Sequence, residues 1–322
     1  MLKKQEDLQK TPLKATASKA KTVDPAIRRK QEITAQNRAI IKTAFDIAKK
    51  NKAKALFIYV DAIDENVIPD KLPEGVQIIL ITKSPEYTYN GKHPFKDIVV
   101  IPRLKLGRMA LIKIAVVFAL SAKMVHPDDK IVSLVGKSES NSLDTLMYFQ
   151  ISTEQELLTG HSLADMPKSI IPAVFEHTLN LAIEFGNKGK EGKPIGTIFV
   201  LGDEEKAMQL SKQMIINPFK GYEPEERNIL NPALKETLRE LSSVDGAFII
   251  AGNGEIITAG RYLGASMEDS DIPRGLGSRH LAASGITALT KAIAIVISES
   301  TGDVRIFREG KIIMEIEKAS HV

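Results

Sequence analysis

Short runs of Val, Ile and Leu alternate with segments of helical periodicity in the first half of the chain. The apolar runs are ALFIYV (55–60), VQIILIT (76–82), DIVVIP (97–102) and KIVSLVG (130–136). Strands that are apolar on both faces are typical of a parallel sheet covered by helices on each side. Helical spacing over 25–51, which begins with Pro25, and over 106–122 supplies those helices. The sequence therefore predicts a three-layer α/β domain with a parallel sheet over residues 25–152.

A second unit follows a polar connector at 152–169. Its pattern predicts a strand at 197–203, a hairpin at 245–260 around Gly-Asn-Gly, a strand at 292–300 and a final hairpin at 301–317. Helices are predicted at 170–186, at 204–214, at 233–244 and after the turn that ends at Gly277. A length of 322 residues favours two domains, since one core rarely grows past roughly 250 residues. We therefore expect a mixed-sheet α/β domain over residues 153–322.

Charge and composition limit the classes of function. The first 30 residues hold nine Lys/Arg and three Asp/Glu, a net of +6, and taking this from the total of +4 leaves −2 for the rest. The basicity thus lies in a polar tail, predicted to be disordered over 1–24, and nucleic-acid binding is not expected of the folded part. The absence of cysteine excludes disulfides and thiolate catalysis and fits a cytoplasmic protein. The most apolar windows fall short of the ~20 residues of a membrane span, so no membrane partner is expected.

Three segments of the second unit combine small residues with charge. In GLGSRHLAAS (275–284), Gly275 and Gly277 could form a nest of backbone N–H groups for an anion. Ser278 is predicted to cap the following helix, whose N-terminus favours phosphate. Arg279 offers a forked donor for phosphate oxygens, and His280 could become positive as phosphate charge develops. An ordinary Gly-x-Gly turn remains the other interpretation of this stretch.

The other two segments each contain a carboxylate. In VDGAF, Asp245 precedes Gly246 and Ala247, whose small size would let a ligand approach the backbone; Asp-Gly is also a common structural turn. In VISES, Glu299 follows an apolar strand, where ligands of α/β sheets gather, and could bind a divalent cation or be a solvated loop acid.

The order and spacing of these segments resemble the diadenylate cyclase (DAC) domain. That family carries Asp-Gly-Ala, then Gly-x-Arg-His-Arg about thirty residues later, then Ser-Glu-Glu at a strand end. The resemblance spans most of residues 155–317 and is closest to the archaeal branch. It implies an enzyme that joins two ATP molecules into cyclic di-AMP with Mn²⁺ or Mg²⁺, as a homo-oligomer at least dimeric.

The resemblance also implies roles for single residues. The catalytic group would be Asp245, Arg279 and His280, and the metal ligands Asp245 and Glu299. The residues implied to bind ATP are Gly246, Ala247, Leu263, Gly277, Ser278, Arg279, His280, Ser298 and Glu299. Two positions depart from the family pattern, because Leu281 replaces an arginine and Ser300 a glutamate. A nucleotide-binding sensor of ATP or cyclic di-AMP with weak catalysis therefore remains an alternative.

The first domain resembles the C-terminal domain of pyruvate kinase in the order of its parts. The closest stretch is VIPRLKLGRMALIKIAVVFALSAKMVHPDDKIVSLVGKSESNSLDTLMYFQI, residues 100–151. The loop after the first strand departs from that pattern, since it reads DAIDEN (61–66) and its carboxylates would repel phosphate. The resemblance implies the fold and no activity.

Overall fold

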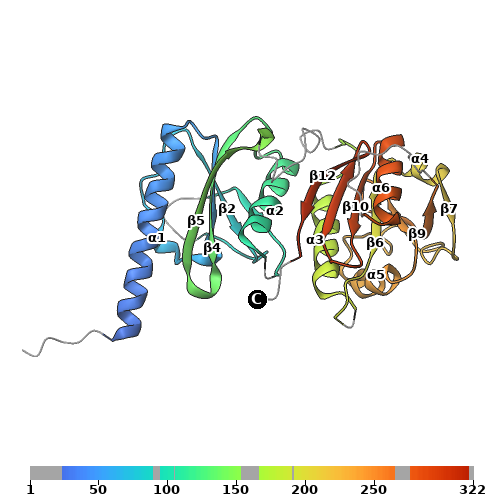
Figure 1. The fold of residues 1–322 in the computed structure, drawn as a ribbon, viewed down its shortest axis with the longest axis horizontal. Coiled ribbons are helices and arrows are strands. Elements are labelled where there is room, and N and C mark those ends of the chain that lie inside the picture. The colour runs from blue at the N-terminus through green and yellow to red at the C-terminus, as the bar shows by residue number, and fades with distance from the viewer. Residues whose placement is uncertain are drawn as a thin grey trace, which may run out of the picture.

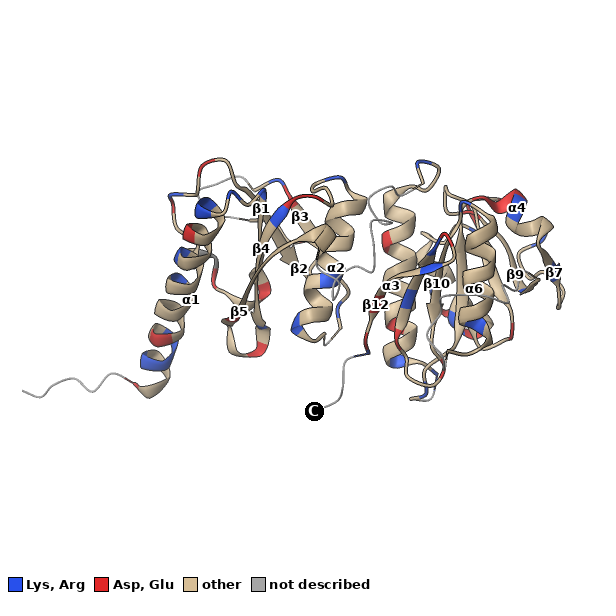
Figure 2. Ribbon diagram, turned by 45° about the horizontal axis from the view of Figure 1, so that its top comes forward, with Lys and Arg blue, Asp and Glu red and all other residues tan. Residues whose placement is uncertain are grey.

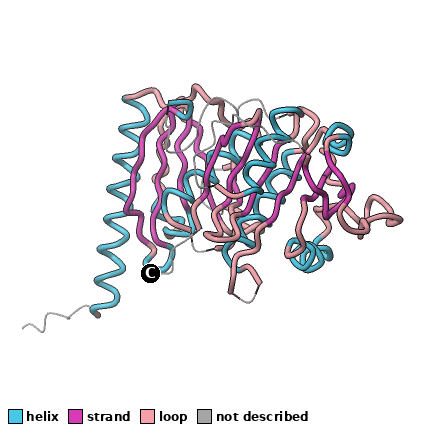
Figure 3. The backbone as a smooth tube through the Cα atoms, turned by 45° about the vertical axis from the view of Figure 1, so that its right-hand side comes forward, coloured by secondary structure: helices cyan, strands magenta, loops and turns pink. Residues whose placement is uncertain are grey.

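The chain forms two separate sheets, which lie next to each other along the length of the molecule (Figures 1 and 3). This computed structural model describes residues 24–89, 95–104, 106–153, 167–190, 192–264 and 276–318. Residues 1–23 of the predicted tail, most of the predicted connector and Gly275 lie outside the described residues. The domain boundary between residues 152 and 153 stays a prediction.

The first sheet has the strand order β3-β2-β1-β4-β5. Its strands are β1 (Ala55–Tyr59), β2 (Gln77–Thr82), β3 (Ile98–Val100), β4 (Lys130–Lys137) and β5 (Ser142–Gln150). The first four strands pair in parallel, as the apolar runs predict. The prediction of a parallel sheet is wrong for β5, which pairs antiparallel with β4. A short helical turn, η3 (Ser138–Ser140), and a left-handed Asn141 reverse the chain here, and a connection this short cannot join parallel strands.

Helices α1 (Pro25–Lys50) and α2 (Arg108–Ser121) cover this sheet. The apolar stripe of α1, which includes Ile41, Ala44 and Ala48, is buried and packs against β5 and β4. The N-terminal turns of α1 extend past the sheet, and Figure 2 shows Lys and Arg spread along the exposed side of the helix. Helix α1 thus packs through one face and leaves the other to solvent.

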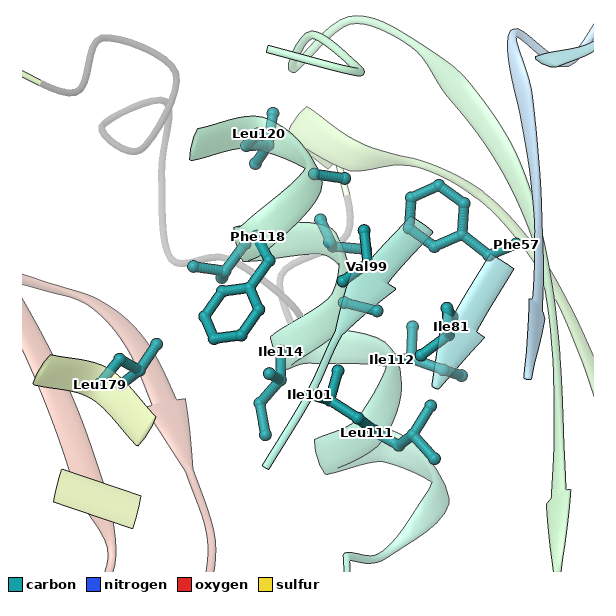
Figure 4. Packing of buried hydrophobic residues seen from close by; sticks show 14 of the residues in the cluster. Phe57, Ile81, Val99, Ile101, Leu111, Ile112, Ile114, Phe118, Leu120 and Leu179 are labelled. Carbon is teal, nitrogen blue, oxygen red and sulfur yellow. The ribbon is translucent and has the colours of Figure 1, made fainter. Parts of the chain in front are cut away.

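Helix α2 is apolar on all sides because it is buried between the two halves of the molecule. Ile112 lies near Phe57 and Ile81 of the first sheet, whereas Phe118 lies on the side nearer Leu179 of α3 (Pro172–Lys188) (Figure 4). A helix that is hydrophobic all round is a buried helix. Within the described ranges, no helix is both long and apolar enough to cross a membrane.

Two polar contacts accompany this packing of the two halves. The Ser121 hydroxyl donates to Glu176 Oε1 at 2.7 Å, and Lys113 Nζ donates to the Glu315 carbonyl at 3.2 Å. Burial raises the pKa of Glu176, and the Ser121 hydroxyl opposes that rise by stabilising the carboxylate. The two halves are therefore joined by polar as well as apolar contacts.

The second sheet has seven strands in the order β12-β11-β10-β6-β8-β9-β7. They are β6 (Thr197–Leu201), β7 (Ser211–Gln213), β8 (Ala247–Ile250), β9 (Ile256–Leu263), β10 (Ile293–Ile297), β11 (Val304–Arg308) and β12 (Lys311–Ile316). Only the β6–β8 pair is parallel among the described pairings, and both predicted hairpins, β8–β9 and β11–β12, are present. The prediction of a mixed sheet is confirmed.

Alternate side chains of this sheet enter two separate cores. On one face, Phe199 and Ile295 pack with α3; on the other, Val200 and Val296 pack with α6 (Ser278–Leu289). This alternation follows from the period of two along a strand. Helices therefore cover both faces of the central strands.

The predicted helix at 204–214 is wrong in its second half. Helix α4 (Glu204–Gln209) ends early, and Ser211 to Gln213 form the edge strand β7, paired antiparallel with β9. Buried Arg261 of β9 donates to the Ser211 hydroxyl and carbonyl and to the Met208 carbonyl. These hydrogen bonds stabilise a strand at Ser211 to Gln213, and tertiary contacts of this kind override helix propensity.

The second half also contains helix α5 (Lys235–Ser242), which the short turn η6 (Pro232–Leu234) precedes.

Candidate active site

Asp245 and Gly246 lie in the loop between α5 and β8. Gly246 has φ +120°, a conformation that other residues rarely adopt. A Cβ atom there would lie 2.6 Å from the carbonyl carbon of Gly260, so the neighbouring strand leaves no room for a side chain. The tight loop presents Asp245 to solvent, with its side chain 80% exposed.

The motif around residue 277 forms the start of helix α6. Gly277 is the N-cap, its φ is −75°, and no atom lies within 4 Å of the position a Cβ would take. The prediction that Ser278 caps the helix is wrong, because Ser278 is the first helical residue and no side chain makes a cap hydrogen bond. No side chain therefore accepts a hydrogen bond from the backbone N–H groups of the first turn, and these groups can donate to a bound anion. Gly275, the other half of the predicted nest, lies outside the described residues.

Arg279 joins the three predicted segments. Its NH2 donates to Asp245 Oδ1 at 2.9 Å and its NH1 to Glu299 Oε2 at 2.7 Å. The arginine side chain is 29% exposed, whereas Glu299 is 67% exposed. The three side chains come from the loop before β8, the first turn of α6 and the end of β10. One cation therefore lies between two accessible carboxylates, and the group carries a net charge of −1.

Gly196, a residue that the sequence interpretation missed, makes this arrangement possible. A Cβ atom at Gly196 would lie 2.7 Å from Glu299 Cβ and 2.9 Å from Arg279 NH1. Any larger residue just before β6 would therefore displace the ion pairs. The only signal in the sequence was a glycine directly before an apolar strand.

His280 is buried at the start of α6. Its side chain is 5% exposed and packs against Phe307, with ring centroids 6.1 Å apart. Burial and the nearby Arg305 and Arg279 lower the pKa of His280 from 6.5 to about 4. The imidazole is therefore neutral at physiological pH in this structure, because a buried positive charge beside two arginines is unfavourable, and its role toward a phosphate stays a prediction.

Arg305 fixes the tautomer of this neutral ring. Arg305 NH1 lies 3.2 Å from His280 Nε2, and a guanidinium can only donate, so Nε2 accepts and Nδ1 carries the proton. Nδ1 is buried without a partner among the described residues. Arg305 in turn pairs with Glu315 of β12 and lies 3.8 Å from Asp303. The sequence interpretation missed Arg305 because strand β11 carries no motif that marks it.

Ser298 and Ser300 lie in the turn after β10. Ser298 is buried, its Oγ lies 3.2 Å from the Ser300 Oγ, and it accepts a hydrogen bond from Thr301 N at 3.3 Å. Its backbone N–H donates to the Asp303 carbonyl. Ser298 therefore shapes the turn that carries Glu299, and Ser300 supports that turn.

The two apolar residues implied to bind ATP lie beneath α6. Ala247 and Leu263 belong to one buried cluster with Ala283 and Ile286 of that helix. Ala247 is fully buried and Leu263 is 5% exposed. They support the floor of the site, and only their outer edges and backbone could contact a nucleotide.

Asp245 and Glu299 have the chemistry of ligands for Mg²⁺ or Mn²⁺. Across the part of the chain that is described, no three His, Cys, Asp or Glu side chains lie close enough together to hold a metal ion. Two carboxylates suffice where substrate phosphates complete the coordination, as is common for Mg²⁺. Each carboxylate uses one oxygen for Arg279 and has no described partner on the other. The donor set therefore fits a divalent ion that arrives with a nucleotide.

Two family models match separate parts of the chain. The family described as "DisA bacterial checkpoint controller nucleotide-binding" matches residues 185–312, and the family "Probable sensor domain DacZ_P" matches residues 36–159. A diadenylate cyclase from Methanocaldococcus jannaschii is 38% identical over 217 residues, which cover 67% of this chain and 69% of the relative. A diadenylate cyclase from Haloferax volcanii is 38% identical over 216 residues, 65% of this chain and 76% of the relative.

A solved structure of DacA from Staphylococcus aureus, a double cysteine mutant, shares 26% identity over 44% of this chain and 84% of its own, with a TM-score of 0.30. That TM-score is too low to support a comparison of folds.

The match to a nucleotide-binding family and the relatives named diadenylate cyclase show that the chain is an enzyme of the nucleotidyltransferase class. The chain belongs to the diadenylate cyclase family. The resemblance of its first domain to the C-terminal domain of pyruvate kinase stays a prediction.

Proposed function

We propose that this protein condenses two ATP molecules into 3′,5′-linked cyclic di-AMP and two pyrophosphates. The observation that carries the proposal is the convergence of Asp245, Arg279 and Glu299 at the N-terminus of α6. Nucleotidyl transfer needs groups that position phosphates and stabilise their charge, and little covalent chemistry from the protein. The relatives named diadenylate cyclase support the choice of reaction.

The reaction consists of two equivalent steps. In each, the 3′-hydroxyl oxygen of one ATP forms a bond to the α-phosphorus of the other, the bond to the β-phosphate oxygen breaks, and pyrophosphate leaves. The hydroxyl proton is lost in the same step. The second step closes the ring. We assign the free oxygen of the Asp245 carboxylate to accept a hydrogen bond from the attacking hydroxyl, which aligns it and favours loss of its proton.

Arg279 and the first turn of α6 would hold the triphosphate. The N–H groups of Arg279 beyond the two ion pairs have no described partner. The pairs with Asp245 and Glu299 restrict the orientation of the guanidinium before substrate binds, so less freedom is lost on binding. Gly277 leaves open space beside this turn, where a phosphate could approach the backbone.

We expect Asp245 and Glu299 to hold Mg²⁺ or Mn²⁺ when the nucleotide binds. The ion would neutralise phosphate charge and make the hydroxyl more acidic. Asp245, Arg279 and Glu299 carry a net charge of −1, which favours uptake of a cation together with the anionic substrate. Neutral His280 would act as a fixed buried support for the helix start rather than as a phosphate cation.

The site is proposed to be shared between two DAC domains that face each other. The product has two equivalent linkages, whereas one domain contributes one Asp245 and one Arg279. A two-fold axis between two copies supplies both in matched positions. A single copy would then bind ATP without forming product.

The variant Asp245→Asn tests the assignment of the acid. We expect it to bind ATP and to form at least ~100-fold less cyclic di-AMP, because the amide neither holds the metal nor accepts the hydroxyl's hydrogen bond well. Product is measured by mass spectrometry after incubation with ATP and Mn²⁺ or Mg²⁺, and ATP binding by calorimetry. Glu236→Gln, an exposed acid of α5 that is 72% exposed, should retain activity as the matched control. Normal turnover by Asp245→Asn would remove Asp245 from this role.

A nucleotide sensor with weak catalysis is the second candidate. Leu281, in the first turn of α6, is 43% exposed where the family pattern has an arginine, so one expected phosphate contact is missing. ATP or cyclic di-AMP would then bind without turnover. The same assay separates the two functions: binding of ATP with no product from the unaltered protein, in either metal, would favour the sensor.

A further inference from the structure

A cavity of about 430 Å³ lies at the carboxyl edge of the first sheet, far along the chain from the cyclase motifs. It is lined by Asp61, Lys83, Ser84, Arg103 and Leu104. These residues follow the carboxyl ends of β1, β2 and β3. In open parallel sheets, ligands bind outside the carboxyl ends of the strands, where the strand order reverses. The order reverses between β1 and β4, and the cavity lies next to this point, at the carboxyl ends of β1, β2 and β3.

Lys83 is a half-buried cation that the carboxylates of Asp61 and Glu139 attract through their charge, without a direct ion pair to either. Its ammonium makes no hydrogen bond or ion pair with any described residue, and it lies 5.9 Å from the centroid of the Tyr59 ring. Burial lowers its pKa, which shows that the charged form is poorly solvated there. A half-buried ammonium without a partner is unfavourable for folding and is therefore a candidate for ligand binding.

The nearby acid, Asp61, is already occupied by other donors. Thr82 Oγ1 donates to Asp61 Oδ1 at 2.7 Å, and the backbone N–H of Lys83 donates to Oδ2 at 2.8 Å. Both carboxylate oxygens are thus used to fix the loop after β2 rather than to pair with the Lys83 ammonium. Two cations, Lys83 and Arg103, line the cavity beside this one acid, and Glu139 is a second acid close enough to attract Lys83.

Arg103 supplies the second cation. Its Nε donates to the Lys83 carbonyl at 3.1 Å, which holds the guanidinium beside the same loop. Its terminal nitrogens have no partner in the described part of the chain. Beneath the site, the Tyr59 hydroxyl is buried, with the residue 1% exposed, near the side chains of Ser138 and Asp61. The Lys83 ammonium and the terminal nitrogens of Arg103 are therefore the groups at this edge that lack direct partners among the described residues.

We propose that this edge of the first domain binds the phosphate or carboxylate group of a small metabolite, between Lys83 and Arg103. An oxyanion would give the Lys83 ammonium a direct ion pair and would accept hydrogen bonds from the free N–H groups of Arg103. The Ser84 hydroxyl can supply a further donor. The site is separate from the cyclase motifs and does not depend on the proposed reaction.

The test measures anion binding by the full chain in an Arg279→Ala background, which weakens phosphate binding at the catalytic site. Inorganic phosphate and citrate are the probes, each compared with sodium chloride at equal ionic strength, and the readouts are calorimetry and the melting temperature. We expect at least one probe to bind and to raise the melting temperature. Phosphate acting alone indicates a phosphorylated ligand, and citrate acting alone a carboxylate.

Two variants and one control locate the binding. Lys83→Met and Arg103→Gln should each weaken it at least ~10-fold, since a charged hydrogen bond is lost. Lys130→Met, an exposed lysine at the opposite end of β4, should leave it unchanged. In a chain that keeps Arg279, Lys83→Met should raise the melting temperature without anion or leave it unchanged, and should keep the rate of product formation. No binding of either probe, or binding that survives both variants, would overturn the proposal.

Discussion

A single arginine organises the candidate active site at the scale of residues. Arg279 contacts Asp245 and Glu299, which lie 34 and 20 positions away in the sequence. Exposed ion pairs contribute little to stability, typically below about 1 kcal/mol each. Their value here lies in orienting the guanidinium. A lysine could not replace it, because an ammonium does not present the forked donors that reach both acids.

His280 should make the stability of the protein depend on pH. Its pKa is about 4 in the folded chain against 6.5 for an ordinary histidine, so only the unfolded chain takes up this proton between these values. Stability should fall as pH falls from 6.5 to 4, by an amount on the order of 3 kcal/mol, and this contribution should be level outside that range. Urea unfolding of the unaltered protein and His280→Gln at several pH values measures the difference.

The matched control for that measurement is His126→Gln, which removes an exposed histidine. Its side chain is 75% exposed, so the variant should keep the slope of stability between pH 6.5 and 4. Equal slopes in His280→Gln and the unaltered protein would mean that His280 titrates normally in the folded chain.

Arg305 should hold the pKa of His280 down. Burial is the larger cause and the charge of Arg305 the second, so Arg305→Gln should raise the pKa without bringing it to 6.5. An NMR titration of the histidine ring, assigned with His280→Gln, measures this. A purely structural role of Arg305 would leave the pKa unchanged, and that result would refute the assigned contact with Nε2.

Helices and strands of this site approach one another closely at glycines. Substitution of two of these glycines, Gly246 and Gly277, should change stability by different amounts. Gly246→Ala places a Cβ 2.6 Å from the backbone of β9 at φ +120°, so we expect a loss of several kcal/mol of stability. Gly277→Ala meets no atom within 4 Å at φ −75°, so it should cost only about 1 kcal/mol as a cap residue. Thermal unfolding measures both.

The variants Gly246→Ala and Gly277→Ala also separate an effect on folding from an effect on substrate binding. If phosphate approaches the backbone at Gly277, the folded Gly277→Ala protein should still lose cyclic di-AMP formation. A fully active Gly277→Ala protein would show that no such approach occurs. A fully stable Gly246→Ala protein would contradict the close contact between the loop before β8 and strand β9.

Helices and strands were predictable wherever a periodic apolar pattern was long enough. Runs of Val, Ile and Leu predicted the buried strands β1, β2, β6 and β10, and a long apolar segment predicted helix α2. Strand β7 was not predictable, since three polar residues become a strand only through pairing with β9. Strand β5 was missed as well, because its direction depends on a tight reversal at Asn141.

The whole molecule should depend on self-association for its activity. If two domains share each active site, specific activity should fall steeply when the protein is diluted below its dissociation constant, while ATP binding persists. Product formation and mass by light scattering across a concentration series measure this. Activity per molecule that stays constant through dissociation to monomers would exclude the shared site.

The two halves of the molecule are joined through α2, which packs against α3 and β12. Lys113 of α2 donates to the backbone of Glu315, whose side chain pairs with Arg305 beside His280. A continuous series of contacts thus runs from the first domain to the start of α6. The proposed anion site at Lys83 and the candidate active site at Arg279 therefore belong to one packed structure.

The sequence by itself determined the two α/β units and the three segments that carry charge, because apolar periodicity and motif residues are local properties of the chain. Tertiary structure alone decided that Arg279 lies between Asp245 and Glu299, that Gly196 leaves it room, and that His280 is neutral. Ion pairing, close approach and desolvation depend on distances between residues far apart in the sequence. Such distances exist only after the chain has folded.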